Sequence, residues 1–245
     1  MTPFSGLFSS ESVSEGHPDK LADRISDAVL DAFLEREPTA RVACETMLAD
    51  QCVIVAGEFR TKDPSTFRQV REQTVGLVAD VLRRAGYTDA ASGIDPERCE
   101  VQVRFHGQSS HIAQGVDRAD GVLGAGDQGL MFGYACDETP ELMPAPIVYA
   151  HRLVQCQADL RRTGAIPWLR PDAKSQVTIR YEGGRPVEVA AIVLSTQHSP
   201  DVDQATLHEV VHRQILDRVV PPAMRSADCR ILINPTGAFV VGGPN

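Results

Sequence analysis

The chain has 245 residues, 42% hydrophobic and 23% charged, a profile typical of one large or two ordinary globular domains. Its formal net charge of −9 excludes a general nucleic-acid-binding surface, which needs an excess of basic residues. There is no run of about 18 apolar residues that would span a membrane, and the N-terminus lacks the basic and apolar regions of a signal peptide. We therefore expect a cytoplasmic protein whose six cysteines are reduced.

Residues 12–20 read Ser-Val-Ser-Glu-Gly-His-Pro-Asp-Lys and lead into an amphipathic helix. The apolar residues that follow recur at helical spacing: Leu21, Ile25, Ala28, Val29, Ala32 and Phe33. Pro18 suits the first helical turn. His17, Asp19 and Lys20 then lie at a helix N-terminus, where free N–H groups and the helix dipole can hold phosphate. An ordinary helix cap is the alternative. The particular string favours a phosphate site, with Asp19 as a ligand of a divalent metal.

The rest of the first half is predicted as a hairpin, a helix and a strand: residues 42–47, residues 51–59, a helix opened by Asp63-Pro64 and stopped by Gly86, and residues 100–105. A short strand near Leu7 is also predicted, before the first helix. Glu45 and Glu58 fall on the two hairpin arms. Acidic residues in such strands often mark only the solvent face, but one of these two could hold a cation and the other an ammonium group.

Residues 106–127 are glycine-rich and without periodicity, and we interpret them as a long loop. The second half repeats the plan of the first: a strand at 129–136, a helix at 147–162, hairpin strands at 176–181 and 187–195, a helix at 202–219 and a strand at 230–233. The expected fold is α+β, built from repeated β-α-β-β-α-β units. Helices cover one face of each mixed sheet, and the other, flat face packs against a partner sheet or subunit.

Two further strings bear on chemistry. Residues 124–129 match the dinucleotide-binding pattern G-x-G-x-x-G, but that motif needs a strand before it and a helix after it. Here a loop precedes and a strand follows, so we exclude dinucleotide binding. The glycines instead allow a close backbone approach and place Asp127 at a strand start. Asp172 and Lys174 precede another strand, where Lys174 either reaches a polyphosphate or is an ordinary exposed lysine.

Together these strings resemble the S-adenosylmethionine synthetase (methionine adenosyltransferase) family. The matching stretches occur in family order: residues 8–20, 41–46, 124–134, 168–178, 194–199 and 233–237. The resemblance implies an N-terminal domain at 1–106, a mobile active-site loop at 107–124 and a central domain at 125–245, with the family's C-terminal domain absent. It also implies a transferase of S-adenosylmethionine biosynthesis and one-carbon metabolism.

In the reaction that the resemblance implies, the thioether sulfur of L-methionine attacks C5′ of ATP and displaces the triphosphate. The triphosphate is then hydrolysed to pyrophosphate and phosphate. The implied roles are as follows: His17, Asp127 and Lys174 are catalytic; His17, Asp172, Lys174 and Phe239 bind ATP; Glu58 and Gln108 bind methionine; Asp19 binds Mg²⁺ and Glu45 binds K⁺. Residues from Gln108 to about Arg118 match the mobile loop. The implied assembly is a homodimer or higher oligomer with shared active sites, or a pairing with a longer homologous chain, with no nucleic-acid or membrane partner.

Three departures from the family matter. Ala238 replaces an arginine that contacts polyphosphate, Ser110-His111 replaces Pro-Asp in the loop, and the chain stops where the family continues. Three interpretations follow: an active methionine adenosyltransferase, a non-catalytic or regulatory subunit that pairs with a longer homologue, and a polyphosphate-hydrolysing or nucleotide-binding remnant. The first is favoured because the matched site residues are retained.

Overall fold

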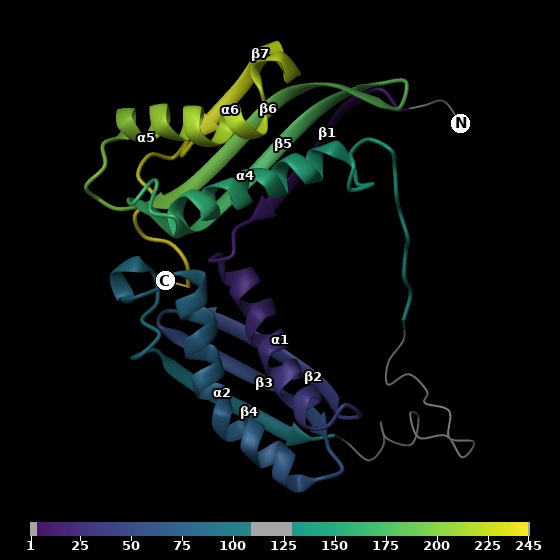
Figure 1. Cartoon of the computed structure of the whole chain (residues 1–245), viewed down its shortest axis with the longest axis vertical. Helices are drawn as coiled ribbons and strands as arrows, with labels where there is room; N and C mark the ends of the chain where they lie inside the picture. The colour runs from purple at the N-terminus through teal and green to yellow at the C-terminus, as the bar shows by residue number, and fades with distance from the viewer. Residues whose placement is uncertain (1–3, 109–128, 245) are drawn as a thin grey trace.

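The structure, a computed structural model, describes residues 4–108 and 129–244 and contains two mixed β-sheets (Figure 1). One sheet has the strand order β1-β5-β6-β7: Gly6–Val13, Leu169–Glu182, Arg185–His198 and Arg225–Ile233. The other has the order β2-β3-β4: Arg41–Ala49, Cys52–Arg60 and Glu100–Gly107. In both sheets an antiparallel hairpin is followed by a parallel neighbour, β4 beside β3 and β7 beside β6.

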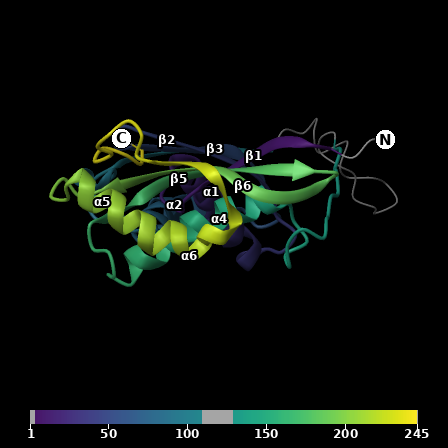
Figure 2. The same ribbon diagram turned by 90° about the horizontal axis from the view of Figure 1, so that it is seen from above.

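Helices cover one face of each sheet. The β2-β3-β4 sheet carries α1 and α2, and the β1-β5-β6-β7 sheet carries α4, α5 and α6: Pro18–Arg36, Pro64–Ala85, Ala145–Arg162, Gln204–Val211 and Asp217–Val219. A π-helical turn, His212–Leu216, joins α5 to α6. Short 3₁₀ turns occupy Ala90–Ser92 and Pro222–Met224. Seen from above, the strands lie along one side of the molecule and α4, α5 and α6 along the other (Figure 2). The expected α+β fold is confirmed.

Local sequence signals explain the element boundaries of the first half. His17 caps α1, and the stripe predicted for that helix is buried apart from Ala28. The Asp63 side chain accepts from the Ser65 N–H at 2.8 Å at the start of α2. Gly86 ends α2 with a φ of 101°, which favours glycine. Asp50 and Gln51 both have positive φ, as the tight turn of the β2–β3 hairpin requires.

Each sheet packs on its own hydrophobic core. In the first core, Phe33 stacks on Phe59 with ring centroids 4.8 Å apart, and Phe59 lies 4.3 Å from Phe105. The second core is formed by aliphatic side chains of α4, β6 and α5, among them Leu153, Ile192 and Leu207. Two separate cores agree with two structural units. The domain boundaries at 106 and 124 stay predictions.

Two predicted strands differ from the structure. The strand near Leu7 exists as β1, but it pairs antiparallel with β5 and so belongs to the sheet of the second half. The strand predicted at 129–136 is wrong: those residues are irregular, and the Met131 side chain is 93% exposed. A short run of apolar and aromatic residues indicates strand tendency only, because a ladder also needs a neighbouring strand. Here β1, with eight paired residues, forms the edge of that sheet.

The described cysteines are all unpaired and half-buried, as reduced thiols would be. Among residues 4–108 and 129–244, no helix is both long enough and apolar enough to span a bilayer.

Candidate functional site

The segment between β1 and α1 crosses from one sheet to the other and lies directly against the start of β5. The Ser14 hydroxyl donates to the Pro171 carbonyl and accepts from the Ala173 N–H, both at 2.7 Å. A Cβ at Gly16 would lie 2.4 Å from Pro171 Cβ and 2.6 Å from its carbonyl oxygen. Only glycine permits this approach, so the chain before His17 is in backbone contact with the residue before Asp172.

His17 is the N-cap of α1. Its Nδ1 accepts from the Asp19 N–H at 3.2 Å, and its own N–H donates to the Ser14 carbonyl at 3.1 Å. Because Nδ1 accepts, a neutral His17 ring carries its proton on Nε2, which is then a donor available to a ligand. The His17 side chain is partly exposed, while Asp19 projects into solvent at the same helix end.

Asp172 is buried beside His17. Its Oδ2 accepts from the Gly243 N–H at 2.8 Å. Burial raises the pKa of the Asp172 carboxyl, and this outweighs the opposing effect of the Gly243 N–H. The nearby charges of His17 and Asp19 also act on this carboxyl, in opposite directions. The structure thus brings His17, Asp19 and Asp172 together.

The C-terminal segment, residues 239–244, closes over this junction. Phe239 and His198 are joined twice: the Phe239 N–H donates to His198 Nε2, and the His198 N–H donates to the Phe239 carbonyl, both at 3.0 Å. The Val240 carbonyl accepts from Gln197 Nε2 at 3.0 Å and from Arg170 Nη1 at 3.1 Å. These bonds fix the position of Phe239 near the segment that holds Asp172.

Lys174 lies on β5 two residues after Asp172, on the sheet face away from α4. Its Nζ is 3.2 Å from Glu11 Oε1 on β1, and both side chains are exposed. We call His17, Asp19, Asp172, Lys174 and Phe239 the junction site.

The other predicted site residues lie on the open face of the β2-β3-β4 sheet. Glu45 is exposed on β2, and Glu58 is exposed on β3 opposite Ala43 and His106. The Gln108 N–H donates to the Phe59 carbonyl at 2.9 Å, which places Gln108 at the same end of the sheet as Glu58.

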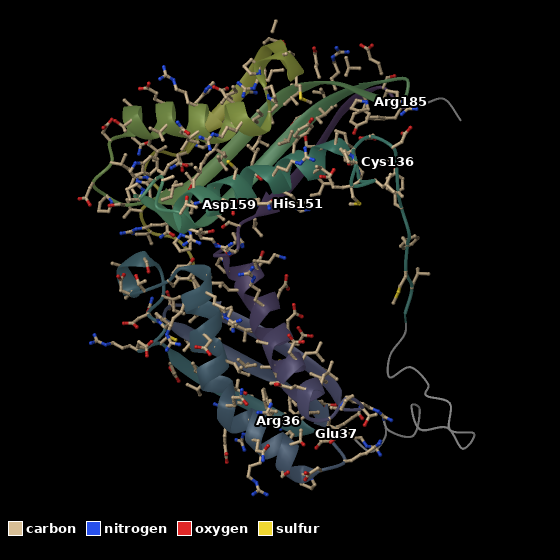
Figure 3. The ribbon with its side chains drawn as sticks, viewed as in Figure 1. Arg36, Glu37, Cys136, His151, Asp159 and Arg185 are labelled. Carbon is tan, nitrogen blue, oxygen red and sulfur yellow. The ribbon has the colours of Figure 1, made fainter. Side chains whose placement is uncertain are left out.

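That end is remote from the junction site. The start of β3 lies beside the junction, because Gln51 Nε2 donates to the Gly93 carbonyl and Gly93 lies against Gly242. Glu58 is six residues further along β3, about 20 Å at the usual rise per residue. The end of β3 lies by Glu37, whose carboxylate accepts from the Lys62 N–H, at the far end of α1 (Figure 3). Within one chain, the structure does not bring Glu58 and Gln108 to His17.

Asp127 and the predicted mobile loop from residue 109 onward lie outside the described residues.

Sequence reasoning missed the residue that anchors the His17 segment. The Glu15 carboxylate, 7% exposed, accepts from Arg161 Nη2 at 2.6 Å, from Arg24 Nη1 at 3.4 Å and from Arg162. Arg161 Nη2 also donates to the Ala85 carbonyl at the end of α2, at 2.9 Å. Glu15 lies within residues 12–20, but nothing in the sequence around Arg161 and Arg162 on α4 marks them as its partners.

The junction site fits Mg²⁺. This ion is commonly held by one or two carboxylates, with water and substrate phosphates completing its shell. Asp19 and Asp172 supply carboxylates close enough to interact electrostatically. Within the described part of the chain, no group of three or more His, Cys, Asp or Glu side chains forms a complete metal cage. Glu45 offers a single carboxylate on the open sheet face.

Comparison with family models gives two matches. The S-adenosylmethionine synthetase N-terminal domain matches residues 5–110, and the S-adenosylmethionine synthetase central domain matches residues 122–239.

Proposed function

Because this chain belongs to the S-adenosylmethionine synthetase family, we propose that it forms S-adenosylmethionine from ATP and L-methionine. The methionine sulfur forms a bond to C5′ of ATP, the C5′–O bond breaks, and the triphosphate leaves with the electron pair. One water then cleaves the triphosphate to pyrophosphate and phosphate. The observation that carries this proposal is the His17 imidazole, whose Nδ1 is capped by the Asp19 N–H, at the N-terminus of α1 beside buried Asp172.

The proposed roles follow from charge and position. Negative charge builds on the triphosphate as the C5′–O bond breaks, so donors aimed at that oxygen lower the barrier. His17 Nε2–H donates to the bridging oxygen, and Lys174 and the positive end of the α1 dipole bind the phosphates. Asp172 holds ATP, and Phe239 contacts adenine.

Asp19 and Asp172 would hold Mg²⁺, and Glu45 would contribute a ligand to K⁺. When bound, Mg²⁺ neutralises part of the phosphate charge, which stabilises the transition state by several kcal/mol. Asp19 suits this role because its carboxylate is 87% exposed and so reaches a ligand in solvent.

Glu58 and Gln108 are proposed to bind methionine, with Asp127 near the substrates. The separation of about 20 Å between Glu58 and the junction supports a homodimer in which one subunit's Glu58 and Gln108 complete the partner's site. The open faces of both sheets are the surfaces available for this assembly.

The alternative function is a regulatory subunit that pairs with a longer homologue. One observation favours it: position 238, just before the C-terminal segment, is an exposed alanine where the family places a phosphate-binding arginine.

The test is turnover of the purified 245-residue chain with ATP, L-methionine, Mg²⁺ and K⁺, with S-adenosylmethionine and phosphate quantified separately by chromatography. His17→Asn should slow transfer by about 2–4 kcal/mol in activation free energy while ATP binding changes little, as for one lost charge-stabilising donor. His208→Asn, at an exposed position of α5, is the matched control.

The proposal is supported if the chain forms S-adenosylmethionine and His17→Asn slows that transfer by the expected amount. ATP binding without product favours the regulatory alternative. Hydrolysis of added tripolyphosphate without transfer favours a hydrolytic remnant.

A further inference from the structure

Tyr87, just after α2, is a buried residue that the proposed mechanism does not use. Its side chain is 0% exposed and its hydroxyl donates to the Gly16 carbonyl at 2.5 Å. The Tyr87 N–H donates to the Leu82 carbonyl, which anchors the residue to the end of α2.

The Tyr87 hydroxyl lies between two backbone segments of the junction site. A Cβ at Gly243 would lie 2.3 Å from the hydroxyl oxygen, and one at Gly93 would lie 2.7 Å from the ring. Gly243 in turn donates to Asp172. Two glycines thus leave space for this side chain, and the hydroxyl touches the segments that hold both His17 and Asp172.

The bond from Tyr87 holds one particular peptide group. The Gly16 carbonyl and the His17 N–H belong to the same planar peptide unit. Tyr87 binds this unit at its oxygen, and the Ser14 carbonyl accepts from its N–H at 3.1 Å. The His17 carbonyl, in the next peptide unit, accepts from the Leu21 N–H at 2.9 Å. With the peptide groups on both sides of His17 bound, the direction of its Cα–Cβ bond is restricted.

The hydroxyl also keeps its proton. Burial raises the pKa of Tyr87 well above its ordinary value, and the negative charge of Asp172 raises it further, while Arg161 opposes this. Tyr87 therefore remains a hydrogen-bond donor throughout the neutral range.

We infer that Tyr87 is a positioning residue for His17: its hydroxyl fixes the Gly16–His17 peptide and so aims the imidazole at the leaving oxygen. This inference rests on the proposed function for its catalytic consequence. Its structural part, the orientation of the His17 ring, can be measured without turnover. Displacement of a reacting group by about 1 Å can cost up to a hundredfold in rate.

Tyr87→Phe is the test, because it removes one oxygen and keeps the ring. The matched control is Tyr149→Phe on α4, whose hydroxyl contacts Met224 Sδ at 3.4 Å and whose ring packs against the second core. In ¹H–¹⁵N spectra of the imidazoles, with His17 assigned from His17→Asn, Tyr87→Phe should shift or broaden the His17 ring signals. Tyr149→Phe should leave them in place.

The kinetic expectation is a kcat for transfer about tenfold lower in Tyr87→Phe, about 1.4 kcal/mol, with the KM for ATP within twofold of the parent. If Tyr87→Phe does not fold, 3-fluorotyrosine at position 87 is the second variant. It keeps nearly the same side-chain shape but changes the hydrogen-bond strength of the hydroxyl, and the same imidazole spectra report the effect on His17.

The inference would be overturned if Tyr87→Phe folds and melts at a lower temperature but its His17 ring signals match those of the parent. A chain without transfer activity would contradict the proposed function alone, because the His17 spectra would still decide the role of Tyr87.

Discussion

The Glu15 carboxylate and the Arg161 guanidinium lie 2.6 Å apart, although 146 positions separate them in sequence. Both side chains are largely buried. The pair joins the segment before α1 to the C-terminal end of α4, and Arg161 extends the link to the end of α2. A buried charge that loses its partner keeps its desolvation cost, so this contact is sensitive to substitution.

Glu15→Gln should lower the free energy of unfolding by about 3 kcal/mol, because Arg161 remains buried without a counter-charge. Urea unfolding measures the change. Glu182→Gln, at an exposed carboxylate that pairs with Arg180, is the control and should change stability little. Equal midpoints for the two variants would contradict the role given to Glu15.

Gly16→Ala should destabilise the protein by about 1–3 kcal/mol, because the new methyl group would force the His17 segment away from Pro171. ATP affinity should fall with it, measured by calorimetry. Gly76→Ala is the matched control: it lies within α2 with no atom within 4 Å of the added Cβ. It should stabilise the helix by about 1 kcal/mol. A Gly16→Ala protein as stable as the parent would show that the approach to Pro171 is not tight.

Asp19→Asn should raise the Mg²⁺ concentration needed for half-maximal transfer by about tenfold, since a neutral amide is a weaker ligand for a hard cation. A Mg²⁺ titration at saturating ATP measures this. Asp31→Asn, at an exposed position further along α1, removes the same charge away from the junction. An unchanged titration for Asp19→Asn would remove it from the metal site.

Asp172→Asn should change how stability depends on pH. The folded-state pKa of Asp172 is raised above its ordinary value of 3.8, so its carboxyl binds a proton more tightly in the folded state. Its favourable contribution is complete below that ordinary value and is lost as pH rises through the folded pKa. The stability of the parent relative to Asp172→Asn should therefore fall as pH rises from about 4 toward neutrality. Urea unfolding at a series of pH values measures this, and a pH-independent difference would refute the assignment.

Ala238→Arg should tighten binding of tripolyphosphate about tenfold, because a hydrogen bond to a charged group contributes about 1.5 kcal/mol or more. Ala238 is exposed, so the longer side chain has room. Val241→Arg, at a position three residues further on that is 68% exposed, controls for added charge. Equal affinities for the two variants would mean that position 238 has no special access to phosphate.

Sequence reasoning succeeded where the signal is local. Helical spacing after Pro18 located α1, and the clustering of His17 and Asp19 at its N-terminus followed from that start. It did not reveal that Asp172 is buried, because the group that encloses it, Gly243, lies 71 positions away. It also gave no distance between Glu58 and His17. The end of the sheet at which Glu58 lies depends on the direction of the hairpin strands, which no local pattern specifies. The sheet to which β1 belongs depends on tertiary contacts, which the pattern of residues along the strand does not specify.

The pairing of β1 with β5 also has a consequence in time. Gly6 is made well before its partner, Tyr181. A chain growing at about 5–20 residues per second needs on the order of 10 s or more to synthesise the segment between them. Throughout that interval the backbone N–H and C=O groups of β1 lack their partners on β5. Until β5 emerges from the ribosome, β1 is an unpaired strand, the kind of segment that can pair wrongly with another chain.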